Sequence, residues 1–339
     1  MTPTLVQQLH ARVPAATLTA TPHAEPFTAV RAALEQTRAV NPHYARQALK
    51  RLLDSGAYAE APGQDDEDDD PMDWAYGEYV ALLGAQADHD RADCVRYALG
   101  GTEVALWEKP RLLAAHSTTG FRTWEAALVL SEWMRAGGAP LAPGGSVLEL
   151  GCGTGLCSLV LLRAGLATSA FVTDGDEALV RGPLARNFEL NGGVPVASVA
   201  LAAELQSGET APQTQTGAAA PPLRFALPNG AHGTLQRLLW GEDSVPPADI
   251  VIGADITYDP SLLPALCTTL RSALVGGARA CYISATVRNR DTLEAFHTAL
   301  ANNGLRFEQV HEATSFTTPL LRMQRPALLA PVLIYKITL

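Results

Sequence analysis

The most informative chemical pattern in the chain is a glycine-rich turn formed by Gly151, Gly153 and Gly155. The turn follows a short apolar run at residues 146–150 and precedes a segment with helical character. Glycines lack a Cβ, so they let the backbone approach a ligand closely at the carboxyl end of a strand, where open α/β sheets bind their ligands. The spacing is G-x-G-x-G rather than the G-x-G-x-x-G that is typical of dinucleotide-binding folds. The turn therefore predicts a ligand site, and its spacing argues against a dehydrogenase.

Two carboxylates flank this turn. Glu149 lies at the end of the preceding strand, where its charge repels a pyrophosphate and attracts an ammonium group. This favours S-adenosylmethionine, whose methionyl end carries an ammonium and whose sulfonium is cationic. Asp174 directly follows the next apolar run, at residues 170–173, where an acidic side chain can accept hydrogen bonds from both ribose hydroxyls. Asp176 is a nearby alternative for that role. Without a ligand role, Asp174 would simply be a solvated acidic residue in a loop.

A third carboxylate, Asp255, follows the apolar run at residues 250–254 and is expected at the same sheet edge as the glycine turn. A lone Asp at a strand end often caps the next helix. Here, however, Asp259 followed by Pro260 is the better cap. Asp255 and Tyr258 are then left for other chemistry.

These residues require a sheet whose strand ends meet at one edge. The later part of the chain alternates short apolar runs with longer amphipathic segments, which predicts an α/β fold with a mostly parallel, doubly wound sheet. A stretch at 206–234, rich in Gly, Ala, Pro, Thr and Gln, interrupts this rhythm and predicts a flexible, low-complexity insertion. The predicted strands are residues 146–150, 170–173, 235–240, 250–254, 280–285, 306–310 and 332–337.

The first part of the chain lacks this alternation and carries mainly helix signals. Asn41 followed by Pro42 predicts a helix start, Gly56 predicts its end, and a second helix is predicted near Asp73. The acidic run at 65–70 predicts a solvated loop. Two apolar runs at 94–99 and 103–107 predict a hairpin, and residues 123–135 predict a helix. We therefore expect a helical N-terminal domain at 1–95 with the acidic loop, and a second domain at 96–339 that contains the insertion.

Composition limits the possible partners. The 339 residues contain 25 Lys plus Arg and 35 Asp plus Glu, a net charge of −10, which argues against direct nucleic-acid binding. The five cysteines form no CxxC pair, so reduced thiols fit better than disulfides or a zinc site, and no metal is expected. No secretory signal or membrane span is evident. We expect a soluble cytoplasmic protein without membrane contact, and no feature of the sequence indicates an oligomeric state.

Three further motifs are informative together: DITY at 255–258, TTGFRTWEAA at 118–127 and LWG at 239–241. On these motifs, the stretch from about residue 95 to 339 resembles a class I, seven-strand, Rossmann-like S-adenosylmethionine-dependent methyltransferase. It is most similar to the protein-lysine methyltransferases with an Asp-x-x-Tyr motif, and within them to the elongation factor 2 lysine methyltransferases.

The resemblance implies a role for each matching residue. Asp174 would bind the ribose, Trp240 would lie near the adenine, and Glu149 would reach the methionyl amine directly or through water. Asp255 and Tyr258 would handle the substrate lysine. On residue type alone, a role in the hydrophobic core is favoured for the tryptophans, and only the resemblance to the family reverses that preference. The remaining cofactor contacts would come from Trp124, Gly151, Cys152, Gly153, Gly155 and Ala254.

The sequence thus predicts a protein-lysine N-methyltransferase that uses S-adenosylmethionine and acts on elongation factor 2. Two alternatives stay open. One is a methyltransferase of another protein or a small molecule, although the Asp255-x-x-Tyr258 motif disfavours a small molecule. The other is a non-catalytic binding module that retains the fold. The helical N-terminal domain carries no catalytic pattern and is expected to dock the protein substrate or cover one side of the cleft.

Overall fold

The computed structural model describes residues 2–20, 25–57, 70–88, 90–112, 119–196 and 220–339. The chain divides into two compact units, one of Met1–Leu112 with Ser315–Leu328 and one of Leu113–Thr314 with Leu329–Leu339. The sequence predicts a division at 95–96 instead. That boundary falls within the first strand of the hairpin, whereas the first unit continues through the hairpin to Leu112 and also includes a segment from near the C-terminus.

The first unit consists of helices and the predicted hairpin. Asn41 accepts a hydrogen bond from the backbone N–H of Tyr44 at the start of α3, and Gly56 ends that helix with a φ of 61°. Of the predicted acidic loop, only Asp70 lies within the described residues, and its side chain caps α4. The elements are α1 (Leu5–His10), α2 (Phe27–Val40), α3 (Pro42–Ser55), α4 (Pro71–Ala81), β1 (Asp93–Leu99), β2 (Thr102–Glu108) and α12 (Pro319–Gln324).

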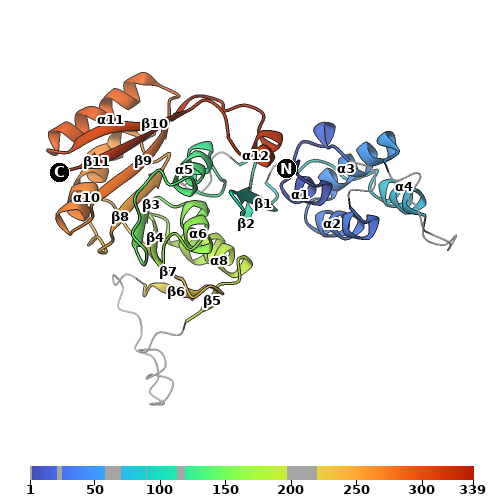
Figure 1. Cartoon of the computed structure of the whole chain (residues 1–339), viewed down its shortest axis with the longest axis horizontal. Helices are drawn as coiled ribbons and strands as arrows, with labels where there is room; N and C mark the ends of the chain where they lie inside the picture. Colours follow the sequence, from blue (N-terminus) through green and yellow to red (C-terminus); the bar gives the residue numbers. More distant parts are fainter. Residues whose placement is uncertain (1, 21–24, 58–69, 89, 113–118, 197–219) are drawn as a thin grey trace, which may run out of the picture. The chain divides into compact units, whose positions relative to one another are not determined.

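The second unit is built on a nine-stranded sheet with the order β10-β11-β9-β8-β3-β4-β7-β6-β5 (Figure 1). Neighbouring strands from β9 to β7 run parallel, and β11 runs antiparallel to both of its neighbours. The strands are β3 (Ser146–Leu150), β4 (Ser169–Asp174), β5 (Val194–Pro195), β6 (Leu223–Ala226), β7 (His232–Arg237), β8 (Ile250–Ala254), β9 (Ala280–Thr286), β10 (Arg306–Ala313) and β11 (Val332–Thr338).

Helices cover both faces of this sheet. Figure 1 shows α10 and α11 on one face and α5, α6 and α8 on the other, so the sheet is doubly wound as predicted. The core under α10 and α11 includes the buried side chains of Leu148, Val251 and Phe296. The helices are α5 (Glu125–Arg135), α6 (Leu156–Arg163), α7 (Glu177–Leu179), α8 (Ala185–Leu190), α10 (Leu263–Val275) and α11 (Arg290–Asn302), with a π-helical turn at Val180–Leu184 before α8 and a 3-10 turn at Pro260–Leu262 before α10.

Strand order explains where a ligand can bind. β3, the first strand of the sheet in chain order, lies between β4 and β8, so the connections leave its two sides in opposite directions. In open α/β sheets a crevice forms at such a switch point, outside the carboxyl ends of the strands. Register supports this, because Glu149 pairs with Val172 on β4 and with Ile252 on β8. The ends of β3, β4 and β8 therefore meet at one edge.

Two predictions about this region were wrong in part. The third strand was expected at 235–240 and lies at His232–Arg237, because the chain leaves the ladder after Leu238 donates its N–H to the Asp174 carbonyl at 2.9 Å. The insertion was expected to be flexible throughout 206–234. Residues 197–219 lie outside the described part of the chain, but 223–226 form β6, where buried Phe225 packs 5.6 Å from Phe188. That apolar contact outweighs the Gly- and Pro-rich composition nearby.

Candidate functional site

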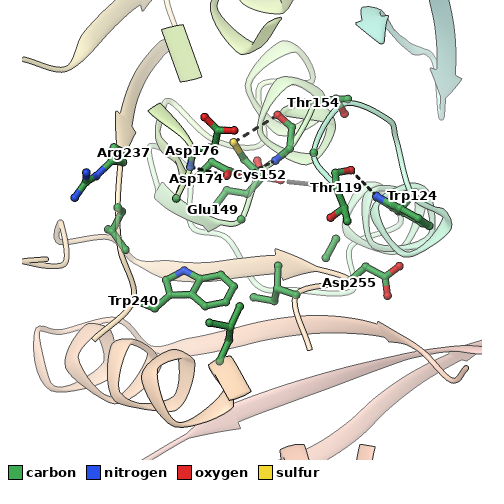
Figure 2. Close-up of a pocket in the computed structure, with 18 of the residues that line it drawn as sticks. Thr119, Trp124, Glu149, Cys152, Thr154, Asp174, Asp176, Arg237, Trp240 and Asp255 are labelled. Carbon is green, nitrogen blue, oxygen red and sulfur yellow. Dashed lines mark hydrogen bonds between the residues drawn. The ribbon is translucent and has the colours of Figure 1, made fainter. Parts of the chain in front are cut away.

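A cavity of about 780 Å³ lies in the second unit at the carboxyl ends of β3, β4 and β8 (Figure 2). In Figure 2, Trp124 and Asp255 lie at one end of the cavity and Arg237 lies at the other. The structure brings the predicted carboxylates together, since all three line this one hollow. The predicted site residues that line it are Trp124, Glu149, Gly151, Cys152, Gly153, Asp174, Trp240, Ala254, Asp255 and Tyr258.

The glycine turn forms the floor of this cavity. Gly151 and Gly153 have φ angles of 58° and 51°, which side chains rarely allow. A Cβ added at Gly151 would lie 2.7 Å from Cγ2 of Ile256, so the backbone has no room for a side chain there. The next N–H, that of Cys152, donates to the Thr173 carbonyl at 2.9 Å. This bond fastens the turn to the end of β4.

Gly155, the last glycine of the turn, does not line the cavity. It is the N-cap residue of α6, and a Cβ added there would lie 2.5 Å from Cδ1 of Leu184. Its lack of a side chain therefore serves helix packing, and its position does not support the predicted cofactor contact.

Asp174 is held by the backbone around it. Its Oδ2 accepts the N–H of Gly153 at 3.1 Å, and its Oδ1 accepts the N–H of Asp176 at 3.1 Å. Burial raises the pKa of Asp174 above its ordinary value, and these backbone donors oppose the rise. Asp176, the alternative in the sequence, is engaged as the cap of α7, where it accepts the N–H of Ala178 at 2.8 Å. Asp174 is thus the better oriented acceptor at this strand end.

Glu149 is buried at the end of β3, on the side of the sheet covered by α6. Its Oε2 accepts hydrogen bonds from both the backbone N–H and the hydroxyl of Ser158. Burial raises the pKa of Glu149 from its ordinary value of 4.5 to about 7. A carboxylate in this state gains most from a cation brought close to it, because the cation offsets the cost of burying the charge.

Trp124 and Trp240 line opposite sides of the cavity. Trp124 is the N-cap residue of α5, and its Nε1 donates to the Thr119 carbonyl at 3.0 Å (Figure 2). Trp240 follows β7 and packs partly buried against the core of the second unit. Each therefore has a structural role and presents an aromatic surface to the cavity, so the two interpretations of the tryptophans apply together.

Asp255 has the most unusual backbone in the site. Its φ of 57° lies in the left-handed region, which is uncommon for a residue with a side chain. Oδ1 accepts the N–H of Thr286 at 3.2 Å, and Oδ2 forms an ion pair with Nη2 of Arg288 at 2.6 Å. The neighbouring Asp259 caps the turn before α10 by accepting the N–H of Ser261, as the sequence indicates. Asp255 is thereby free of helix capping.

Arg288 was not among the site residues predicted from the sequence. This residue follows the end of β9, the strand next to β8, so it lies at the same sheet edge as Asp255. The available signal was its position in the chain. Arg288 comes shortly after β9, and β9 borders β8, the strand that ends just before Asp255.

The opening of the cavity carries Tyr258, whose side chain is half exposed, beside the exposed Leu262. The thiol of Cys152 lies deeper and is buried, and burial raises its pKa well above the ordinary value, so it is a neutral thiol.

Within the described residues, no group of three or more His, Cys, Asp or Glu side chains is arranged to hold a metal ion. Among the helices described, none combines the length and apolar character that crossing a bilayer requires.

Comparisons with known proteins relate this site to a family. A family model described as lysine methyltransferase matches residues 112–217. The protein-lysine N-methyltransferase EFM3 of Saccharomyces cerevisiae is 34% identical over 329 residues, which cover 90% of this chain and 88% of that protein. The chain belongs to the protein-lysine N-methyltransferase family. The protein-lysine N-methyltransferase EEF2KMT of Bos taurus is 31% identical over 252 residues, which cover 71% of this chain and 68% of that protein.

This lysine methyltransferase uses S-adenosylmethionine, which supplies the reactive methyl group. The cavity suits such a ligand in size, since cofactor sites measure roughly 300–1,000 Å³. Its lining also fits. The glycine turn at Gly151 and Gly153 exposes backbone, Glu149 offers a buried carboxylate for a cation, and Trp240 offers an aromatic face.

Proposed function

We propose that the protein methylates a lysine side chain of elongation factor 2. The name EEF2KMT denotes a lysine methyltransferase of elongation factor 2, and that relative is similar over 68% of its own length. The observation that carries the proposal is that Asp255 and Tyr258 line the same cavity as the glycine turn. Methyl transfer needs the methyl donor and the acceptor amine in one shared site. The reaction is expected in the cytoplasm.

The proposed cofactor contacts follow from the groups on offer. Asp174 accepts hydrogen bonds from the ribose hydroxyls, because its two oxygens are fixed by backbone donors and retain lone pairs. Glu149 attracts the methionyl ammonium, directly or through water, and Trp240 packs near the adenine. Trp124, Cys152 and the turn glycines complete the contact surface, together with Ala254.

The proposed lysine contacts lie at the other end of the cavity. A free lysine is almost wholly protonated at neutral pH, because its pKa is about 10.4. The site must therefore accept an ammonium and deliver a neutral amine. Asp255 hydrogen-bonds and orients the lysine nitrogen, and the Tyr258 ring forms a wall that favours the cationic product through its π face. Asp255 need not be the base, since the proton can leave to water before attack.

The test is methyl transfer from labelled S-adenosylmethionine to elongation factor 2 purified from cells that lack this activity. We expect one labelled lysine in that protein, located by mass spectrometry of its peptides. Free lysine and n-butylamine serve as small-molecule acceptors in parallel. In a parallel reaction on a lysate of the same cells, label in another protein with none in elongation factor 2 would contradict the proposed substrate.

A further inference from the structure

Arg288 forms a contact that the proposed reaction does not account for. It lies between β9 and α11, and its Nη2 is 2.6 Å from Oδ2 of Asp255. The side chain of Asp255 is 7% exposed, whereas that of Arg288 is 42% exposed. The arginine is therefore the member of the pair that contacts solvent. A cation already satisfies the carboxylate that is proposed to receive the substrate lysine.

The backbone that carries Arg288 is fixed. The N–H of Val287 donates to the Pro331 carbonyl at 2.9 Å, and the N–H of Arg288 donates to the Thr286 carbonyl at 2.9 Å. Asn289 caps the start of α11. Because both sides of Arg288 are anchored, its release from the carboxylate would come from rotation of the side chain and not from movement of the segment.

Arg288 also contacts the aromatic wall of the cavity. Its Cζ lies 5.1 Å from the ring centroid of Trp124, within the range of a cation–π interaction. A guanidinium on a carboxylate and an aromatic face uses the same two kinds of group that a lysine ammonium would use in this cavity. A lysine ammonium placed at Asp255 would therefore compete with Arg288 for the carboxylate.

We propose that Arg288 occupies the position of the substrate ammonium at Asp255, and that a lysine binds by displacing it. The inference rests on the proposed role of Asp255 in receiving the lysine. Arg288 thereby sets the affinity of the site for amines. A free amine has only its charge with which to displace the arginine, whereas a lysine within a protein substrate also gains from contacts elsewhere on the surface. The ion pair thus favours a protein acceptor over small amines.

The experiment measures binding of Nα-acetyl-lysine methylamide to the full chain loaded with S-adenosylhomocysteine, by calorimetry or NMR titration. In Arg288→Gln, a neutral side chain replaces the competing cation. We expect the probe to bind about two- to fivefold more tightly, the range for a partly exposed ion pair. Arg288→Lys keeps a cation and should retain wild-type affinity. Arg290→Gln is the matched control, because Arg290 is exposed at the start of α11 and within the described residues makes no ion pair with Asp255.

Two further measurements test whether the effect is electrostatic and acts through Asp255. The neutral probe Nα-acetyl-norleucine methylamide should bind equally to wild type and Arg288→Gln. In an Asp255→Asn background, Arg288→Gln should give no gain for the lysine probe. Unchanged or weaker lysine-probe binding in Arg288→Gln would overturn the inference, as would an equal gain in Arg288→Lys or a gain that persists with Asp255→Asn. None of these measurements uses elongation factor 2, so a wrong substrate assignment leaves them interpretable.

Discussion

Three carboxylates line one cavity, and the structure gives each a different environment. Glu149 is buried against Ser158, Asp174 is fixed by two backbone N–H groups, and Asp255 is paired with Arg288. A group that is buried without a full counter-charge responds most strongly to pH, whereas one with a cationic partner responds most strongly to loss of that partner.

Glu149 should make the stability of the cofactor-free protein depend on pH. Its pKa of about 7 exceeds its ordinary value of 4.5, so its contribution is fully present below pH 4.5 and is lost as the pH rises through 7. The loss is on the order of 3 kcal/mol. Glu149→Gln cannot ionise and keeps an acceptor for Ser158. We expect thermal unfolding of this variant to vary less with pH between 5 and 8 than wild type, and equal profiles would count against the prediction.

Asp255→Asn should lower methyl transfer at least about 100-fold while cofactor affinity changes little. Asn tolerates the left-handed backbone at this position and still accepts the N–H of Thr286, but it carries no charge for the lysine. Transfer is measured with labelled cofactor, and affinity by calorimetry. Turnover close to that of wild type would remove Asp255 from the mechanism.

At the scale of elements, Gly151 in the turn after β3 can be compared with Gly165, which also has a positive φ but does not line the cavity. Gly151→Ala adds a Cβ 2.7 Å from Ile256 at a φ of 58°, whereas Gly165→Ala adds one at a φ of 68° with no atom within 4 Å. Both variants carry the strain of a left-handed residue, roughly 1 kcal/mol or more. Only Gly151→Ala should also lose cofactor affinity, by about tenfold or more, because its turn must shift. Equal cofactor affinities, measured by calorimetry, would contradict this.

Some elements were predictable because their ends are marked in the sequence. β3 and β8 match their predicted bounds, since Gly151 and Asp255 directly follow their apolar runs. β7 was misplaced because Leu238 and Trp240 are apolar for another reason: they pack against the core after the strand has ended. Apolar character reports burial, and it does not reveal whether the backbone is still in a ladder.

The ion pair of Asp255 with Arg288 was not predictable in the same way. The two residues are 33 positions apart, and Arg290 follows Arg288 closely, so the sequence offers two cations near this edge. Only the path of the chain after β9 selects between them. The bond of Ser158 to Glu149 likewise depends on the packing of α6 against β3.

At the scale of the whole molecule, the first unit has its own buried ion pair. Arg12 and Asp93 are 12% and 6% exposed, lie 2.9 Å apart, and join the region after α1 to the start of the hairpin. Asn41 adds a hydrogen bond to Asp93 at 2.7 Å.

Asp93→Ala should therefore strongly destabilise the first unit, by about 3–5 kcal/mol, because Arg12 would be left buried without its counter-charge. The measurement is chemical denaturation together with limited proteolysis, and we expect new cleavage within residues 1–112. Lys50→Ala, which removes an exposed pair with Asp54, is the control and should change stability by less than about 0.5 kcal/mol. Similar effects of the two variants would contradict the prediction.

The first unit is closed by α12, from near the other end of the chain. Leu320 belongs to its core, and the side chain of Gln324 donates to the Ala11 carbonyl at 2.6 Å. During synthesis, residues up to Leu112 emerge long before this helix does. At a ribosomal rate of about 5–20 residues per second, the interval is roughly 10–40 seconds. Throughout that interval the core of the N-terminal unit lacks Leu320, so we expect this unit to reach its final packing only after α12 has emerged.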